Sequence, residues 1–243
     1  MNGGQLYLEL GIMMKYIERI KSQICLSPLY DLFGKRSYAQ SGEDLIAWGE
    51  LGGRKRGYYI DVGAYHPKLF SNTFLFYKKG WRGICIDPNP KMEELFRKAR
   101  PGDVFLNMGV GESKKVMEYF EFEDGAANTF SPEQARKNQE EAGRKPIGTR
   151  MVAIMPLKMI FEKYLPNGRK IDLLSVDAEG MDQEVLKSNN WKKYRPEIIV
   201  CEDLEFDFKN WKKSDVTAYL DSLEYDLIAK TPYSLIFKSR TAG

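Results

Sequence analysis

The sequence is poor in histidine and cysteine. It has one histidine, His66, and three cysteines, Cys25, Cys85 and Cys201, among its 243 residues. The cysteines lie far apart, and the last two sit inside apolar runs, where a free cysteine behaves as a small hydrophobic residue. The sequence therefore indicates neither a disulfide framework nor a zinc site.

Long apolar runs and an excess of one charge are also missing. No stretch approaches the roughly 18 apolar residues of a membrane span, and the first residues lack the basic head and cleavage site of a secretory signal. The 37 Lys and Arg residues nearly balance 34 Asp and Glu residues, and the basic pairs are scattered. We therefore expect a soluble cytoplasmic protein with no stable membrane insertion and no nucleic-acid partner.

The N-terminal part of the chain has the pattern of an amphipathic helix. Residues 5–26 carry apolar side chains at mostly three- and four-residue spacing, with charged residues between them. Such a stripe must be covered, either by the same chain or by a second copy, and the second case predicts a homodimer. We therefore divide the chain into an N-terminal helical arm, residues 1–36, and one globular domain, residues 37–243.

From Gly57 onward, apolar β-type runs alternate with helical segments, which is the signature of a mostly parallel sheet covered by helices. The predicted strands are Tyr58–Val62, Gly83–Asp87, Val104–Met108, Ile171–Asp177, Glu197–Glu202, Tyr225–Ala229 and Ser234–Lys238. The predicted helices are Glu43–Glu50, Leu69–Lys79, Lys91–Arg100, Leu157–Tyr164, Asp182–Ser188 and Ser214–Leu223. The connection at Pro232 is too short for a crossover helix, so the last two strands should form an antiparallel hairpin.

One segment departs from this alternation. Residues 116–122 alternate like an exposed strand, and residues 125–150 are polar, charged and interrupted by proline and glycine. Long irregular segments in compact domains commonly form lids or binding loops. We therefore predict that residues 111–155 are an insertion over the mouth of the site.

The first two strands end in residues suited to a nucleoside ligand. The run Y-Y-I-D-V-G-A-Y-H-P places Asp61 at a strand end and Gly63 in a tight turn, and I-C-I-D-P-N-P places Asp87 about 26 residues further on. An acidic residue near that spacing meets ribose hydroxyls in dinucleotide sites. Tyr65, His66 and Pro67 replace the later glycines of a phosphate-binding turn. These features favour S-adenosylmethionine, which has no phosphates, over a dinucleotide.

Further candidate residues lie at the same predicted sheet edge. Asp177 ends the fourth main strand and Glu179 follows it, and Glu202 and Asp203 end the fifth. These carboxylates supply enough oxygen ligands to allow a divalent cation, but we assign no metal site from the sequence. We interpret Asp182 as an ordinary helix N-cap.

His66 lies in the first strand-to-helix turn. Its ordinary pKa of about 6.5 suits a general base near neutral pH, so we rank it narrowly ahead of Asp177 and Glu179. Ser71 and Asn72 either cap the next helix or line the pocket.

Taken together, these residues resemble the FkbM family of methyltransferases. The resemblance covers roughly residues 38–238, with the blocks Y-A-Q-S-G-E-D-L, Y-I-D-V-G-A-Y-H-P, S-N-T-F-L-F-Y-K-K-G-W-R-G-I-C-I-D-P-N-P, A-N-T-F-S, D-L-L-S-V-D-A-E-G-M-D and R-P-E-I-I-V-C-E-D in this order. It implies a Rossmann-like, class I methyltransferase sheet with strand order 3-2-1-4-5-7-6, and S-adenosylmethionine as the donor. On that pattern Asp61, Gly63 and Asp87 match the donor-binding positions, and Asp177 and Glu179 match the acidic turn after the fourth strand. With the neighbouring Ala64, Ser71, Asn72 and Pro88, the first three make up our donor-binding candidates.

The expected activity is methylation of a hydroxyl on a small molecule, such as a sugar, with His66, Asp177 and Glu179 as the catalytic candidates. Two alternatives use the same fold. A nicotinamide-dependent oxidoreductase would need the phosphate-binding turn that this sequence does not show, and a Rossmann-like binding module would need no catalytic residues.

Overall fold

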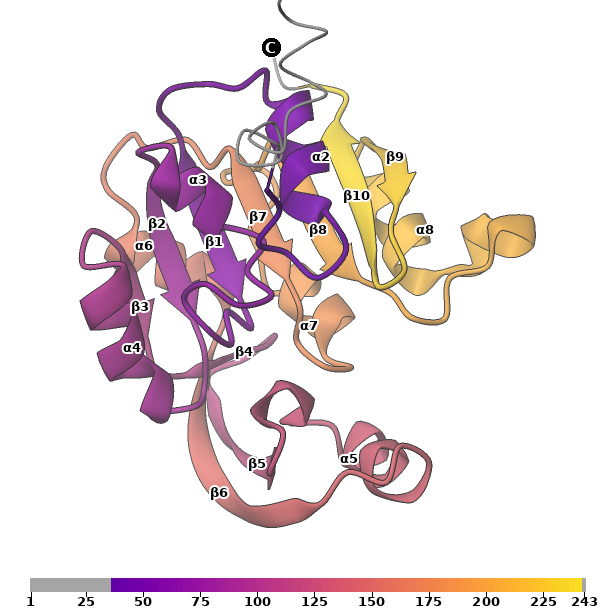
Figure 1. Ribbon diagram of the computed structural model, residues 1–243. Helices are drawn as coiled ribbons and strands as arrows, with labels where there is room; N and C mark the ends of the chain where they lie inside the picture. Colours follow the sequence, from indigo (N-terminus) through magenta and orange to yellow (C-terminus); the bar gives the residue numbers. More distant parts are fainter. Residues whose placement is uncertain (1–35, 242–243) are drawn as a thin grey trace, which may run out of the picture. The chain divides into compact units, whose positions relative to one another are not determined.

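The computed structural model describes residues 36–241, and its centre is a seven-stranded sheet (Figure 1). The strands are β1 (Tyr58–Val62), β2 (Arg82–Ile86), β3 (Val104–Leu106), β7 (Leu173–Val176), β8 (Ile198–Glu202), β9 (Tyr225–Lys230) and β10 (Ser234–Ser239). Their spatial order is β3-β2-β1-β7-β8-β10-β9, with β10 antiparallel to both of its neighbours. In chain order this is 3-2-1-4-5-7-6, the order that the resemblance implies. The predicted C-terminal hairpin is confirmed.

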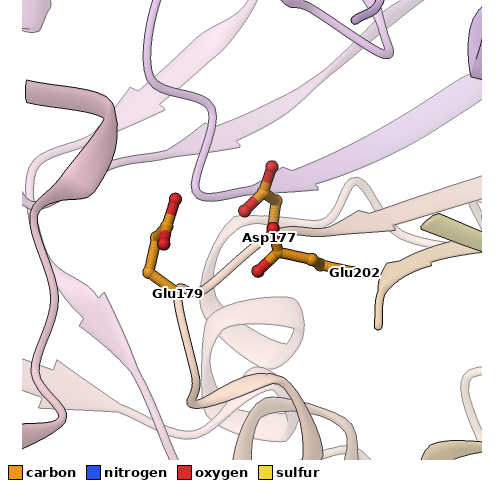
Figure 2. A group of neighbouring side chains, drawn as sticks. All are labelled: Asp177, Glu179 and Glu202. Carbon is orange, nitrogen blue, oxygen red and sulfur yellow. The ribbon is translucent and has the colours of Figure 1, made fainter. Parts of the chain in front are cut away.

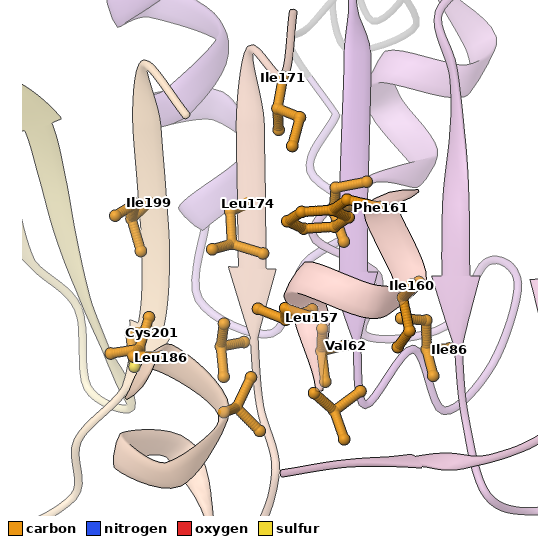
Figure 3. Packing of buried hydrophobic residues seen from close by; sticks show 14 of the residues in the cluster. Val62, Ile86, Leu157, Ile160, Phe161, Ile171, Leu174, Leu186, Ile199 and Cys201 are labelled. Carbon is orange, nitrogen blue, oxygen red and sulfur yellow. The ribbon is translucent and has the colours of Figure 1, made fainter. Parts of the chain in front are cut away.

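Helices cover both faces of this sheet. On one face lie α2 (Glu43–Glu50), α3 (Phe74–Lys78) and α4 (Lys91–Ala99), and on the other lie α6 (Leu157–Tyr164), α7 (Asp182–Lys187) and α8 (Asp215–Ser222). Figure 3 shows Leu157, Ile160 and Phe161 of α6 packed against the central strands. Because both faces are covered, β7 and β1 are buried along their whole length. Their sequences therefore do not alternate between buried and exposed positions.

The alternation along β1 decides which way its last residues face. Tyr58, Ile60 and Val62 pack with α6 and α7, whereas Tyr59 packs with α2 and α3. Asp61 lies between Ile60 and Val62, so its side chain shares the face of Tyr59. It therefore points beneath the helices of that face.

A second sheet lies in the segment that was predicted to be an insertion, and one of its strands, Lys115–Phe122, confirms the exposed strand predicted at residues 116–122. It consists of β4 (Gly109–Val110), β6 (Pro146–Met155) and β5 (Lys115–Phe122), in this order. Helix α5 (Pro132–Glu140) and the short turn η2 (Gly125–Ala127) connect β5 to β6. We call residues 115–155 the cap. Figure 1 shows it beyond the carboxyl ends of β1 and β7.

The prediction of an irregular segment is thus wrong for α5 and β6. Pro146 and Gly148 hid the alternation of β6, and α5 buries only Ala135 and Asn138, so it has no apolar stripe. The signal for α5 was its start, where Ser131 Oγ accepts a hydrogen bond from the Gln134 amide and Pro132 follows as the first helical residue.

The helix predicted to begin at Leu69 begins instead at Phe74. Phe70 adopts a left-handed backbone with φ 54°, which a helix does not accept, and the Ser71 amide bonds to the Tyr38 carbonyl at 2.9 Å. A further short helical segment, η3 (Phe208–Lys213), precedes α8.

The predicted helix at residues 5–26 lies outside the described residues, so the arm and its role in self-association remain predictions. None of the described helices combines the length and the apolar character that crossing a lipid bilayer requires.

A buried charge network holds the α4 end against β1. Arg100 Nε lies 2.7 Å from Asp103 Oδ2, and neither side chain is more than 1% exposed. A second guanidinium nitrogen donates to Thr73 Oγ1 at 3.0 Å, and the Thr73 hydroxyl donates to Asp61 Oδ2. The Tyr59 hydroxyl also donates to Asp103, at 2.7 Å. Arg100 thus compensates two buried carboxylates.

Replacing Arg100 with methionine should destabilise the fold by about 3–5 kcal/mol, because it leaves buried carboxylates without their cation. Urea unfolding of Arg100→Met, beside Arg97→Met on the exposed side of α4, measures this difference. A loss no larger than that of Arg97→Met would contradict the assigned role.

Candidate active site

A cavity of about 1170 Å³ opens at the carboxyl ends of β1, β2, β7 and β8, and the cap forms its other wall. Residues from the sheet side include Gly63, Asp87, Asp177, Glu179 and Glu202. This edge is where open α/β sheets bind their ligands, because the strand-to-helix turns leave a crevice there.

Gly63 turns the chain out of β1 at the cavity wall. Its φ is +74°, and a Cβ atom at this position would lie 1.7 Å from the Asp177 carbonyl oxygen. The amides of Gly63 and Ala64 both donate to the Ile86 carbonyl, at 2.9 and 3.1 Å. Only glycine fits here, because the turn packs against the Asp177 carbonyl; the close approach to a ligand stays a prediction.

Asp87 stands at the neighbouring turn after β2. Its two carboxylate oxygens accept hydrogen bonds from the amides of Tyr65 and Asn89, each at 2.8 Å. Burial raises the pKa of Asp87 to about 7, while these two amides and the charge of Arg150 act in the opposite direction. Each oxygen keeps a lone pair for a further donor, so Asp87 can accept from a hydroxyl group in the cavity.

The cap fixes this turn from the other side. An Arg150 guanidinium nitrogen of β6 donates to the Pro88 carbonyl, and Arg150 Nε lies 3.3 Å from Glu121 Oε1 of β5. The Asn107 amide nitrogen donates to the Asp87 and Pro88 carbonyls, at 3.0 and 2.8 Å. Arg150 and Asn107 had not been singled out from the sequence, because their partners are backbone carbonyls that leave no pattern.

Several predicted donor-binding residues lie behind the cavity wall. Asp61, Ala64, Ser71 and Asn72 are not among the described residues that line the cavity. Ser71 Oγ accepts from the Phe74 amide at 3.1 Å and so caps α3, and the Asn72 side chain donates to Ser175 Oγ at 3.0 Å. These side chains support the turn instead of facing the ligand.

His66 is also placed away from the cavity lining. Its Nδ1 accepts hydrogen bonds from the amides of Lys68 and Leu69, at 3.1 and 3.0 Å. Burial, and then the charge of Lys68, lower its pKa. Since a neutral imidazole has one acceptor nitrogen, this geometry commits that nitrogen to the loop and leaves the ring no free site for a proton.

Three carboxyl groups converge in the cavity instead: Asp177, Glu179 and Glu202 (Figure 2). One oxygen of each lies within 4.8 Å of the others. Burial, followed by repulsion from neighbouring carboxylates, raises all three pKa values: Asp177 well above its ordinary range, Glu179 to about 7 and Glu202 to about 10. Such a group can share protons, and its oxygen atoms could also hold a hard cation.

The backbone of this acidic turn is strained and braced. Glu179 has φ 48°, which is uncommon for a residue with a side chain. The Asp182 carboxylate accepts from the amides of Ala178 and Gly180, at 2.9 and 3.3 Å, and Thr129 of the cap donates to the Glu179 carbonyl at 2.7 Å. Asp182 is therefore not the predicted N-cap: α7 begins at Asp182, after Met181, and the carboxylate supports the turn.

Comparison with known protein families gives one match. The model of the methyltransferase FkbM domain matches residues 61–227, which include the turns at Gly63 and Asp87 and the acidic turn. The chain belongs to the FkbM methyltransferase family. The search of curated proteins gave no match.

The match places the cap inside the FkbM domain and not beside it, because residues 115–155 fall within the matched range. The cap contributes Tyr119, Asn128 and Phe130 to the cavity wall. Asn128 Oδ1 accepts from the Phe122 amide at 2.7 Å, and Tyr119 and Phe130 stack with ring centroids 4.6 Å apart. The wall is thus a packed surface, which fits a methyltransferase site that must exclude water.

Replacing Glu202 with glutamine should raise the melting temperature of this FkbM protein, and more so as the pH rises. The pKa of Glu202 moves from 4.5 to about 10 on folding, so the folded state holds its proton more tightly than the unfolded state. Destabilisation by this group therefore grows from about pH 4.5 towards pH 10, and glutamine removes it. At this chain length each kcal/mol gained corresponds to about 2–4 °C.

Thermal unfolding at pH 5, 7 and 9 measures the effect, with Glu93→Gln, an exposed residue of α4, as the control. A gain that is equal at the three pH values would contradict the assignment.

Proposed function

We propose that this FkbM-family methyltransferase transfers a methyl group from S-adenosylmethionine to a hydroxyl group of a small molecule, such as a sugar. The observation that carries the proposal is the single cavity shared by the Gly63 and Asp87 turns and by the three carboxyl groups. A donor held at the first pair meets an acceptor held at the second. The seven-stranded order fits a class I methyltransferase of Rossmann-like form.

The residues at the donor turns suit a nucleoside without phosphates. Asp87 is a buried acceptor for ribose hydroxyls, and Gly63 lines the same cavity beside it. The described lining has two basic side chains, Lys137 and Arg144, and both are in ion pairs. A diphosphate would therefore find no free cation, which disfavours a nicotinamide dinucleotide.

When bound, S-adenosylmethionine supplies an electrophilic methyl group on a sulfonium centre. The protein's own contribution is to orient the acceptor oxygen, to exclude water through the cap and to take up the hydroxyl proton. Glu179 is the proposed base, because its pKa of about 7 lies near neutral pH and its side chain lines the cavity. Asp177 is proposed to orient the acceptor hydroxyl. This revises the sequence-based preference for His66.

Replacing Asp87 with alanine should weaken S-adenosylmethionine binding by about 1.5–3 kcal/mol, the usual contribution of a hydrogen bond to a charged group. Asp87→Asn keeps the shape and an acceptor oxygen and should lose less. Calorimetry with S-adenosylmethionine, S-adenosylhomocysteine and NAD measures both variants and the wild type, with Glu93→Ala as the control.

Unchanged donor affinity in a folded Asp87→Ala protein would refute the ribose contact. Wild-type protein that binds NAD, or none of the three ligands, would refute the proposed function itself.

Removing the base should slow the chemical step by roughly a hundredfold. We expect this loss for Glu179→Gln and a comparable one for Asp177→Asn, and at most a few-fold loss for His66→Gln. The wild-type rate should rise with pH through about 7, where Glu179 loses its proton.

The measurement is single-turnover transfer of a labelled methyl group, with donor affinity determined separately and with and without EDTA. The acceptor is the one that a screen for labelled products identifies. A hundredfold loss in His66→Gln with normal donor binding would restore His66 as the base, and a rate abolished by EDTA would assign the carboxylates to a metal.

A further inference from the structure

We propose that the methyl acceptor is cationic: a small polyhydroxylated molecule that carries one or more ammonium groups. This inference rests on the proposed methyl transfer and specifies the substrate class of that site. It is carried by the charge of the cavity and by the state of its basic side chains.

The lining of the cavity has a large excess of acidic over basic residues, whereas the protein as a whole has none. Lys and Arg outnumber Asp and Glu in the sequence, 37 to 34, yet within the described part of the chain twelve acidic and two basic residues line the cavity. The acidic residues are Asp87, Asp124, Glu141, Asp177, Glu179, Asp182, Glu184, Glu202, Asp203, Glu205, Asp207 and Asp215. A wall of this sign attracts cations and repels anions.

Neither basic side chain of the lining is available to an anion. Lys137 lies 3.4 Å from both Glu133 and Glu205, and Arg144 lies 2.9 Å from Asp124. A phosphate or carboxylate on the acceptor would therefore have to break an ion pair to gain a cation. This argues against sugar phosphates, nucleotide sugars and acidic acceptors.

The donor does not account for the acidic wall by itself. Asp87 follows β2, whereas Glu202 ends β8 and Glu205 and Asp207 follow it. In the sheet β7 and β1 separate β8 from β2, and neighbouring strands lie about 4.8 Å apart. A nucleoside held at β2 is thus about 14 Å from the β8 side. The carboxylates there face the acceptor part of the cavity.

The cavity is also large enough for a second ligand. Its volume of about 1170 Å³ exceeds the roughly 300–1,000 Å³ of a pocket for one drug-sized ligand. The acceptor region offers neutral hydrogen-bonding groups as well, from Gln134, Asn138 and Asn210. Amide groups of this kind suit hydroxyls, which is why the acceptor is inferred to be polyhydroxylated and cationic at once.

The ionisation of the carboxyl groups fits a cationic partner. Glu179 and Glu202 face further acids, Asp177 and Asp182, and repulsion among them favours the neutral forms. The opposing positive charges, which lower these pKa values, are Arg144 for Glu179 and Lys230 for Glu202. An ammonium group entering the cavity stabilises the charged forms, so its binding should release protons to the solvent.

The test compares ligands that share one sugar scaffold and differ in charge. We would measure binding of the glucosamine monomer, dimer and trimer to full-length protein saturated with S-adenosylhomocysteine, beside the N-acetylated counterpart of each and glucosamine 6-phosphate. At pH 7 in EDTA, the best amine should bind about tenfold or more tightly than its acetylated form, as expected for one added charge-assisted hydrogen bond. Titration in buffers of different ionisation enthalpy should show proton release.

Paired variants localise the effect. Glu141→Gln with Glu205→Gln removes two cavity carboxylates outside the proposed catalytic group, and should weaken amine binding several-fold without changing donor affinity. Glu93→Gln with Glu118→Gln removes two exposed carboxylates elsewhere and should change neither. Failure of every amine to bind more tightly than its acetylated form, or tighter binding of the phosphate, would overturn the proposal. Protein that binds no S-adenosylhomocysteine would instead overturn the proposed function.

Discussion

The crowding of carboxyl groups at one edge of a parallel sheet is the constraint on which the site depends. Because β2, β7 and β8 run in the same direction, the acids at their carboxyl ends, Asp87, Asp177 and Glu202, are brought to one crevice. Burial and repulsion make their charged forms costly. Much of the surrounding structure serves to hold these carboxyl groups in place.

Two buried acids near the carboxyl ends of the central strands have different partners. Asp61 of β1 has the Thr73 hydroxyl as a donor and the charge of Arg100 nearby. Asp177 follows β7, and within the described chain its carboxylate has acidic neighbours, Glu179 and Asp182, and no hydrogen-bond donor. A buried acid without a compensating partner is a candidate for a functional group. This contrast supports a structural role for Asp61 and the role proposed for Asp177.

The sequence identified the elements whose patterns are local. The predicted ranges agree nearly to their ends with the strands β1, β2, β7 and β8. The sequence also placed Asp87, Asp177 and Glu179 at the edge of the sheet where the cavity lies. The sequence alone did not show which way each of these side chains points. Asp61 and Asp87 look equivalent as strand-ending acids, but Asp61 lies one residue before the end of β1 and Asp87 one residue after the end of β2. That difference turns one inward and leaves the other in the cavity.

His66 and the cap were misjudged for a related reason. A lone histidine in the first turn suggested a base on chemical grounds, but the amides of Lys68 and Leu69 occupy its acceptor nitrogen. In the cap, β6 is stabilised by pairing with β5 along its length. Such pairing is invisible in a sequence where glycine and proline interrupt the strand. Both cases depend on partners that carry no side-chain signature.

The cap contacts two turns of the site, the one at Pro88 and the one at Glu179, through hydrogen bonds within the protein. Arg150 bonds to the Pro88 carbonyl at the donor turn, and Thr129 bonds to the Glu179 carbonyl at the acidic turn. Both belong to one packed unit, because Phe120 pairs with Thr129 and also with Thr149 beside Arg150. The cap therefore joins the Asp87 turn to the acidic turn. In the proposed methyl transfer the in-line geometry depends on the relative position of donor and acceptor, and the cap contributes to that position together with the sheet.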